Sequence, residues 1–297
     1  MAITVSNAFV TMFGDEISHL AQAKSSKLQG AVRTVRGVTG SSYKFPTLGK
    51  SGVIKNKTSH QDIQAMSSIS DTTSLTSGSW VGDTDVTAPI GSREATISTY
   101  STGEYIDDFD ALKTNVDLRS AYAESIASAM NRAYDKTIID ALDHAHANEA
   151  LANEDDAGNN ELTRANIAAF GRILNTKDVP LEDRFMLVSP QGYQDILSDT
   201  TIVSAQAGVL SEALRTGVIA NVLGFTIIMS NQLTTVNTSD KRGFAFHKDA
   251  VGMAVGKDIT TMVDYVPQKL STLVAAEFSA GSKVIDLNGV VSFGINA

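Results

Sequence analysis

Two clusters of acidic and histidine residues contain the side chains that metal binding or acid–base catalysis requires. The first, DHAHANE at residues 143–149, has His146 and Glu149 three positions apart. That spacing places two potential ligands on one helical face, but a metal site needs further ligands, and His144 and His146 point in different directions. Histidines near a helix C-terminus also interact favourably with the helix dipole. We therefore interpret this cluster as a polar helix end and expect no metal.

The second cluster, EYIDDFD at residues 104–110, offers carboxylates that could act as a general acid and a general base. It lies just before a long predicted helix, where the positive end of the dipole stabilises acidic side chains, so we prefer a structural role. GDTD (82–85) lacks the spacing and the closing Glu of a calcium loop. LGKSG (48–52) resembles the end of a phosphate-binding loop, but that loop requires a Gly five positions before Gly49, where this chain has Lys44. The sequence predicts no catalytic, cofactor-binding or metal-binding residue, and no enzyme.

Composition narrows the class of protein. Among the 297 residues, 42% are hydrophobic and 19% are charged, which is typical of a folded protein and not of a disordered chain or a membrane bundle. The absence of Cys excludes disulfides, thiolate zinc sites and iron–sulfur clusters. No basic residue precedes Lys24, and no apolar run reaches the roughly 18 residues of a membrane-spanning helix. We expect a soluble intracellular protein, or part of an assembled particle, with no membrane partner.

Charge is unevenly distributed along the chain. Residues 1–57 carry a net charge of +6, whereas residues 58–297 carry −15, for a total of −9. An acidic body repels phosphates, so we expect no binding of nucleic acid over the whole surface. The basic segment is either a chance asymmetry of solvated side chains or an arm that lies on acidic surface of its own chain or a neighbour. Its basic residues are Lys24, Lys27, Arg33, Arg36, Lys44, Lys50, Lys55 and Lys57.

One long predicted helix begins shortly after the 104–110 cluster and ends within the 143–149 cluster. Residues 104–157 contain neither Gly nor Pro, and apolar or small residues recur at steps of three and four between Leu118 and Ala145. The pattern predicts a helix over about 115–148, roughly 50 Å long at ~1.5 Å per residue. Before it, residues 51–100 are rich in Ser and Thr and cannot form a core of their own. This stretch is either a disordered linker or a long hairpin that a partner orders, and its scattered apolar residues and Trp80 favour contacts.

From Glu161 onward, predicted helices alternate with short predicted strands. Turn and capping residues mark their ends. The predictions are a helix capped by Thr163, a buried strand at FMLV (185–188), a helix opened by Ser189 and Pro190, a helix over 205–215, strands at FTIIM (225–229), GFAF (243–246) and GMAV (252–255), and a tight hairpin turn at Asn288-Gly289.

Four segments in a fixed order resemble the major capsid proteins of tailed bacteriophages, especially those of short-tailed phages. SSYKFPTLGK (41–50) is similar to the junction between arm and loop, and Asp117-Leu118-Arg119-Ser120 followed by Tyr122 resembles the entry to the long helix. DVPLEDRFMLVSPQGYQDIL (178–197) and NVLGFTII (221–228) resemble parts of the axial domain. Encapsulins and herpesvirus shells share this fold.

The resemblance implies an α+β fold with an N-terminal arm, an extended loop, a peripheral domain built on a long spine helix, and an axial α/β domain. The implied ranges are 1–45 for the arm, 46–97 for the extended loop as a hairpin, 98–160 and 265–297 for the peripheral domain with its spine helix at about 115–148, and 161–264 for the axial domain.

The resemblance also implies a structural subunit that self-assembles into hexamers and pentamers of an icosahedral capsid enclosing double-stranded DNA, without sequence-specific DNA binding. Scaffolding protein, portal and a decoration protein are the other implied partners. The implied location is the virion capsid, after assembly in the host bacterial cytoplasm. An encapsulin-like nanocompartment shell, and a soluble enzyme with residues 51–100 as a mobile lid, are the alternatives.

Candidate subunit-interface residues follow from the charge pattern and from the extended loop. The basic arm could pair with the acidic cluster before the spine helix of a neighbouring copy. The candidates are Lys24, Lys27, Arg33, Arg36, Lys50, Lys55, Lys57, Trp80, Asp107, Asp108 and Asp110.

Overall fold

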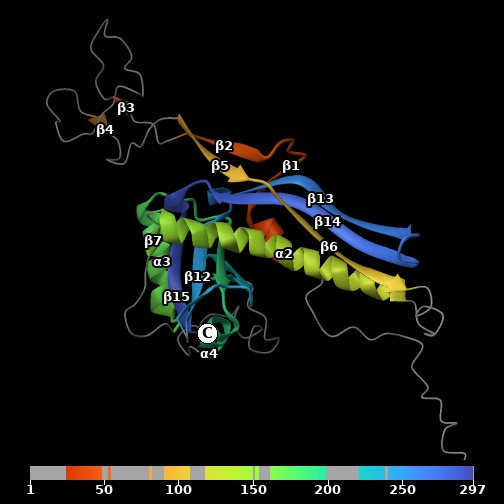
Figure 1. Ribbon diagram of the computed structural model, residues 1–297. Coiled ribbons are helices and arrows are strands. Elements are labelled where there is room, and N and C mark those ends of the chain that lie inside the picture. Colours follow the sequence, from red (N-terminus) through yellow and green to blue (C-terminus); the bar gives the residue numbers. More distant parts are fainter. Residues whose placement is uncertain are drawn as a thin grey trace, which may run out of the picture.

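The computed structural model describes residues 25–48, 53–54, 80–81, 90–107, 118–149, 151–153, 161–198, 221–237 and 240–296. Two β-sheets share one long helix, α2, and two shorter helices cover the other face of the second sheet (Figure 1). This is the mixed α+β fold that the sequence predicts.

Helix α2 (Leu118–Asn148) lies where the long helix is predicted, with residues 115–117 outside the described ranges. Its buried side chains follow steps of three and four from Ile126 through Tyr134 to Ala145, because one stripe of the helix faces the sheets. Tyr122, predicted on the same face, is exposed. The buried stripe enters a single hydrophobic core that both sheets complete.

The first sheet has four strands, in the order β1 (Arg33–Arg36), β13 (Val251–Val266), β14 (Ser271–Val284) and β6 (Ser98–Asp107). β14 pairs antiparallel with both of its neighbours, and β1 is parallel to β13. Alternate residues of β14, including Val274, Ala276 and Phe278, enter the core with α2 and are almost fully buried. The predicted strand GMAV is therefore a small part of a 16-residue strand.

The second sheet has seven strands, in the order β7 (Ala152–Asn153), β15 (Val290–Asn296), β12 (Asp240–His247), β8 (Arg184–Val188), β10 (Phe225–Met229) and β9 (Asn221–Val222), with β11 (Thr235–Asn237) paired to β12. Successive residues of a strand point to opposite faces. Leu187 of β8 enters the core with α2, whereas Met186 and Val188 enter a second core under α3 and α4. Burial of both faces explains why FMLV is continuously apolar.

Helices α3 (Arg164–Thr176) and α4 (Pro190–Ser198) begin at the predicted caps. The hydroxyl of Thr163 accepts a hydrogen bond from the backbone N–H of Asn166 at 3.4 Å. The hydroxyl of Ser189 accepts one from the backbone N–H of Gly192 at 3.0 Å. Both capping predictions are confirmed. None of the helices in the described ranges is long and apolar enough to cross a membrane.

Residues on either side of the Ser/Thr-rich stretch pair with each other. β2 (Ser42–Leu48) and β5 (Ile90–Thr96) form an antiparallel ribbon, with Ser42 opposite Thr96 and Leu48 opposite Ile90. β3 (Val53–Ile54) and β4 (Trp80–Val81) pair in the same sense. At these positions the pairing is that of a hairpin and not of a linker. The predicted helix at 205–215 lies outside the described residues.

The β2–β5 ribbon lies on the four-stranded sheet (Figure 1) and packs there through a small core. Phe45 of the ribbon contacts Ala254 and Ile285 of the body. Gly281 of β14 lies against the ribbon backbone, where an added Cβ would be 2.0 Å from the carbonyl oxygen of Thr96. The ribbon can approach this closely only because position 281 has no side chain.

The C-terminal hairpin predicted at Asn288-Gly289 is wrong. Both residues lie in the 3-10 turn η4 (Leu287–Gly289), and the flanking strands β14 and β15 belong to different sheets. The carboxylate of Asp286 accepts a hydrogen bond from the backbone N–H of Asn288 at 3.0 Å, and a Cβ on Gly289 would lie 2.6 Å from that of Ala250. The segment therefore packs against η3 (Lys248–Ala250) and crosses between the sheets.

The sheets also divide the chain differently from the predicted boundary between residues 264 and 265. β13 and β14 are paired from Val251 opposite Val284 to Val266 opposite Ser271. Because this ladder extends along both strands, with shifts of register between Val255 and Thr260, all of β13 belongs to the four-stranded sheet. β15, in contrast, lies in the seven-stranded sheet.

Replacing Gly281 with Ala should weaken the attachment of the ribbon to the body. The added methyl group would meet the carbonyl of Thr96, a backbone group that cannot rotate away, so we expect the free energy of unfolding to fall by about 1–3 kcal/mol. Thermal unfolding of the purified subunit measures the change. Gly30→Ala is the matched control, because no atom lies within 4 Å of its added Cβ. Equal unfolding midpoints for the two variants would contradict the prediction.

Candidate assembly surfaces

Six of the predicted interface residues lie outside the described ranges: Lys24, Lys50, Lys55, Lys57, Asp108 and Asp110. Trp80 lies in β4, in register with Ile54 of β3. Asp107 is the exposed last residue of β6, in register with Ser271. The other three candidates, Lys27, Arg33 and Arg36, lie in β1 and in the segment before it.

Lys27 belongs to a short segment that Asp135 fixes to the middle of α2. The buried carboxylate of Asp135 accepts hydrogen bonds from the Ser26 hydroxyl at 2.5 Å and from the backbone N–H groups of Lys27 and Leu28 at 3.0 and 3.1 Å. The Lys27 ammonium donates to the carbonyl oxygen of Met229 at 3.0 Å. Hydrogen bonds to an ionised carboxylate are among the stronger ones in proteins. This segment is therefore bound to its own body.

Arg33 and Arg36 lie at the two ends of β1 with exposed side chains. Arg36 pairs with Asp258 of β13 at 3.0 Å, but the two side chains are 54% and 57% exposed, so the pair contributes only about 0.2–1 kcal/mol. The side chain of Arg33 makes no hydrogen bond or ion pair with any other described residue, although its backbone lies in the β1–β13 ladder. Of the three described basic candidates, Arg33 is thus the one whose charge is available to a neighbouring chain.

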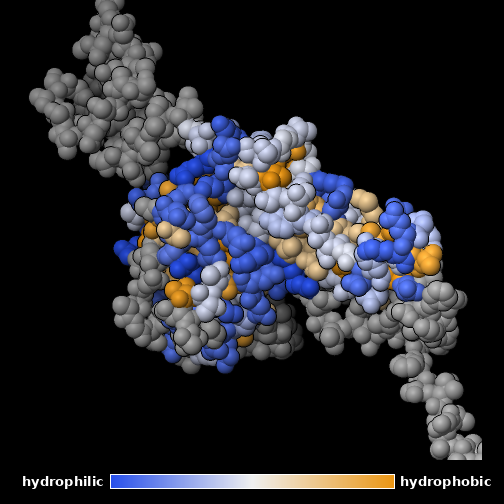
Figure 2. Space-filling model, viewed as in Figure 1, coloured by the Kyte–Doolittle hydropathy of each residue, from blue (hydrophilic) through white to orange (hydrophobic). Residues whose placement is uncertain are grey.

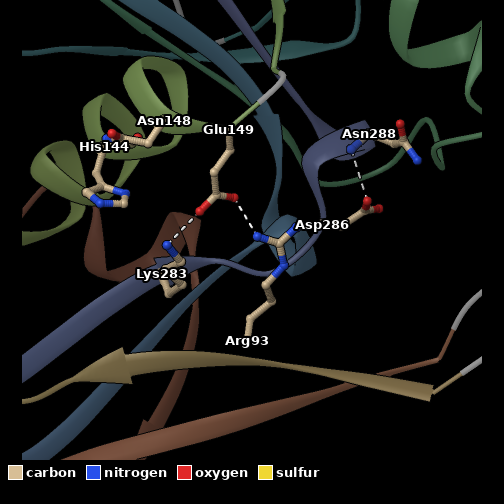
Figure 3. Close-up of polar contacts among 7 residues, drawn as sticks. All are labelled: Arg93, His144, Asn148, Glu149, Lys283, Asp286 and Asn288. Carbon is tan, nitrogen blue, oxygen red and sulfur yellow. Dashed lines mark hydrogen bonds and ion pairs between the residues drawn. The ribbon is translucent and has the colours of Figure 1, made fainter. Parts of the chain in front are cut away.

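A polar junction joins the β2–β5 ribbon to the end of α2 (Figure 3). Glu149, one residue past α2, accepts hydrogen bonds from the Lys283 ammonium at 2.6 Å and from the Arg93 guanidinium at 2.5 Å. Lys283 belongs to β14 and Arg93 to β5. One carboxylate, only 14% exposed, therefore connects the helix, the sheet and the ribbon.

Two opposing effects act on the pKa of Glu149. Burial by itself would raise the pKa, because desolvation disfavours the charged form. The hydrogen bond from Lys283 and the charge of Arg93 outweigh burial, and together they lower the pKa below its ordinary value of 4.5. Glu149 is therefore ionised at neutral pH, with both of its oxygens occupied.

Other residues of the DHAHANE cluster make contacts that join α2 to the seven-stranded sheet. Nδ1 of His146 lies 2.8 Å from the hydroxyl of Ser292 in β15. Asp143 pairs with Arg242 of β12 at 3.6 Å and accepts a hydrogen bond from Thr234. Within the described ranges, no group of three or more His, Asp or Glu side chains could hold a metal ion. These contacts agree with the interpretation of the cluster as a polar helix end.

Large hydrophobic side chains gather on the surface at the end of the β13–β14 hairpin. Figure 2 shows hydrophobic surface at the right-hand end of the view, where this hairpin and β6 end. Single exposed hydrophobic residues are ordinary, but a cluster of them marks a surface that contacts another molecule. We call these residues together the hairpin-tip patch: Tyr105 and Met262 lie on one face of the sheet, Val263 and Tyr265 lie on the other, and Leu270 lies in the connecting turn, each 43–56% exposed.

Sequence reasoning missed Asp135 and the two partners of Glu149. Asp135 lies more than 100 positions from the residues that it binds, and a single sequence contains no signal that joins such distant positions. The one available indication is that Asp135 directly follows Tyr134 on the predicted buried face of the helix. A buried carboxylate needs partners, so its place in the pattern could have suggested an anchor.

Comparison with known proteins gives the class. A family model described as phage capsid protein matches residues 5–295, and the chain belongs to that family. Among solved structures, the chain resembles one from Mycobacterium phage Che8 (20% identity, TM-score 0.69, covering 97% of each chain). It also resembles the capsid of cyanophage P-SCSP1u (17% identity, TM-score 0.71, covering 99% of this chain and 94% of that one). A search of curated proteins finds no match.

The chain is therefore a subunit of a phage capsid, and the role of that family is structural and not enzymatic. Its partner is itself, within a shell, and its location is the virion capsid. The resemblance noted from four short segments of sequence is confirmed.

Glu149→Gln should destabilise the subunit at neutral pH and have little effect in acid. Loss of the charge leaves Arg93 and Lys283 without their partner, at a cost of about 1.5–3 kcal/mol. Because the pKa of Glu149 is lowered in the folded protein, its stabilising contribution is present above pH 4.5 and is lost as the pH falls through the folded pKa. Denaturant unfolding at a series of pH values measures the difference between variant and parent.

The control for this prediction is Glu94→Gln on the same ribbon. Glu94 pairs with Lys44 at 3.9 Å, and both side chains are at least half exposed, so its loss should cost no more than about 1 kcal/mol. The prediction would be wrong if the free energy of unfolding of Glu149→Gln differed from that of the parent by the same amount at every pH. Glu149 would then not be ionised in the junction.

Proposed function

We propose that copies of this chain form hexamers and pentamers of a closed icosahedral shell that encloses double-stranded DNA. The hairpin-tip patch is the observation that carries the proposal, because its five exposed hydrophobic side chains need another molecule to cover them. For a capsid subunit, that molecule is another copy. Closed symmetry repeats one contact in every copy, so interfaces that are weak individually become strong together.

In this assembly the parts of the fold have different roles. The four-stranded sheet and α2 serve as the peripheral domain, and the seven-stranded sheet with α3 and α4 serves as the axial domain. The β2–β5 ribbon is the base of the extended loop, and the chain up to and including β1 is the arm, with β1 adding a strand to the four-stranded sheet. This division follows the two sheets and their cores, and it assigns β13 to the peripheral domain and β15 to the axial domain.

Charge supports the role of a container. The net charge of −9 repels the phosphates of DNA, so the genome is enclosed without sequence-specific binding and is free to leave. We further propose scaffolding protein, a portal and a decoration protein as partners, with assembly in the cytoplasm of the host bacterium.

Electron microscopy of the purified chain, alone and with a candidate scaffolding protein, tests the proposal. We expect closed shells, or a mixture of rings and sheets, in at least one of the two conditions. Uniform small particles in both would overturn it. Nuclease-protected DNA in particles from infected cells is the expected content, and a cargo enzyme in its place would indicate an encapsulin-like compartment.

The basic arm should contribute to assembly by pairing with acidic residues Asp107, Asp108 and Asp110 of a neighbouring copy. Reversal of Lys24, Lys27, Arg33 and Arg36 to Glu should therefore reduce the yield of closed shells, most strongly at low salt. Each exposed ion pair contributes only about 0.2–1 kcal/mol, but the loss is repeated in every copy.

Arg33→Glu alone is the sharper variant, because it leaves the bonds of Lys27 and Arg36 to their own chain in place. Lys136→Glu is the control, since Lys136 pairs with Asp140 within α2 and lies outside the arm. Equal shell yields for Arg33→Glu, Lys136→Glu and the parent at moderate salt would refute the role of the arm charge.

A further inference from the structure

An open groove of about 550 Å³ lies beside α3, on the side of the seven-stranded sheet opposite to α2. One wall is the helix itself, including Gly171 and Arg172. Two turns contribute Leu181 and Leu223 to the lining, and Arg184 at the start of β8 also lines the groove. None of the contacts of the arm, the ribbon or the hairpin-tip patch involves these residues.

In an isolated subunit, Leu is an unfavourable residue type at position 223. It lies with Gly224 in a two-residue turn between β9 and β10, and both residues have positive φ, at 49° and 86°. Such hairpin turns favour Asn-Gly, because Asn tolerates the left-handed region and Leu does so rarely. The turn also leaves the Leu223 side chain half exposed, at 50%. Leu181, which also lines the groove, is 69% exposed.

Arg184 adds a buried positive charge to the groove. The residue is 4% exposed, and its guanidinium donates to the carbonyl oxygens of Val179 and Pro180 at 2.7 Å and to Oδ1 of Asn175 at 2.8 Å. All three acceptors are neutral, and within the described chain no carboxylate pairs with Arg184. Burial lowers the pKa of this guanidinium, although Arg stays charged in proteins. A carboxylate that enters the groove would meet this uncompensated charge at short range.

The lining contains two arginines, Arg172 and Arg184, and no acidic residue, although Asp178, Glu182 and Asp183 lie in the neighbouring turn outside it. A matching ligand therefore carries a hydrophobic side chain and a carboxylate. Beyond residue 57 the chain has 31 acidic and 16 basic residues, so the surface of a second copy supplies such segments readily.

We propose that this groove binds an acidic and hydrophobic segment of a neighbouring copy, with an apolar side chain between Leu181 and Leu223 and a carboxylate facing Arg172 and Arg184. The inference rests on the proposed function, since it requires copies to lie side by side in a shell. It assigns Leu223 to the interface, where burial against the neighbour compensates for its unfavourable turn.

The variant Leu223→Asn should reduce assembly without impairing the folding of the subunit. Asn suits the turn better than Leu, so the unfolding midpoint of the free subunit should stay the same or rise. Loss of the buried side chain should lower the affinity between copies, with about tenfold or greater loss of closed shells at a fixed subunit concentration. Val236→Asn, at an exposed position outside the groove, is the control. Shells that form equally well from Leu223→Asn and Val236→Asn would overturn the proposal, whereas failure of the unaltered chain to form shells would overturn the proposed function instead.

The natural chain has no Cys, so a single introduced thiol can identify the occupant. Leu223→Cys, labelled with a short photoreactive crosslinker, should crosslink in assembled particles to a peptide of this same chain that contains Asp or Glu, and not in the free subunit. The unlabelled thiol should react with a small reagent about tenfold more slowly in particles than in free subunits, while that of Val236→Cys should react at similar rates in both. A crosslink to a different protein, a peptide without an acid, or equal protection at both positions would overturn the proposal.

Discussion

The packing of α2 against β14 is the interaction on which the rest of the structure depends. β14 presents Val274, Ala276, Phe278 and Ala280 to the buried stripe of the helix, and these residues belong to the same core as Leu187 and Phe246 of the second sheet. The other contacts of β14 follow from this position: it pairs with β13 and β6, supports the ribbon at Gly281, and supplies Lys283 to Glu149. A shift of α2 would therefore move both sheets and the ribbon together.

Two segments at the edge of the body, which also pack through buried side chains, are each joined to it by a carboxylate near α2. Asp135 binds the segment before β1, and Glu149 binds the ribbon. These attachments fix where each segment joins the body. That design suits a capsid subunit, in which one sequence must make contacts at several kinds of lattice position. The hairpin-tip patch and the groove beside α3 also expose hydrophobic side chains, which we propose that another copy covers.

Local signals in the sequence predicted the parts whose structure is decided locally. α2, α3, α4, β8 and β10 combine clear periodicity or caps with burial, and they form where expected. The β13–β14 hairpin, the longest strand pair described, was missed because the outer half of β13 is exposed and neither strand alternates polar and apolar residues regularly. Asn288-Gly289 is a strong hairpin signal that failed because Ala250 and Asp286 hold it in a different turn. The proposed role of Arg33 rests on its charge, which the sequence alone shows, whereas the groove depends on two turns brought together only by the fold.

The acidic clusters that first suggest catalysis have a physical reason to be structural. A general acid or base needs a free oxygen and a pKa near the working pH. Glu149 has both oxygens bonded and a pKa below its ordinary value, which is the opposite of what proton transfer requires. Asp135 and Asp143 likewise bind groups from distant segments. Along α2, these carboxylates therefore join distant segments of the chain, and their bonded oxygens stabilise the fold in place of transferring protons.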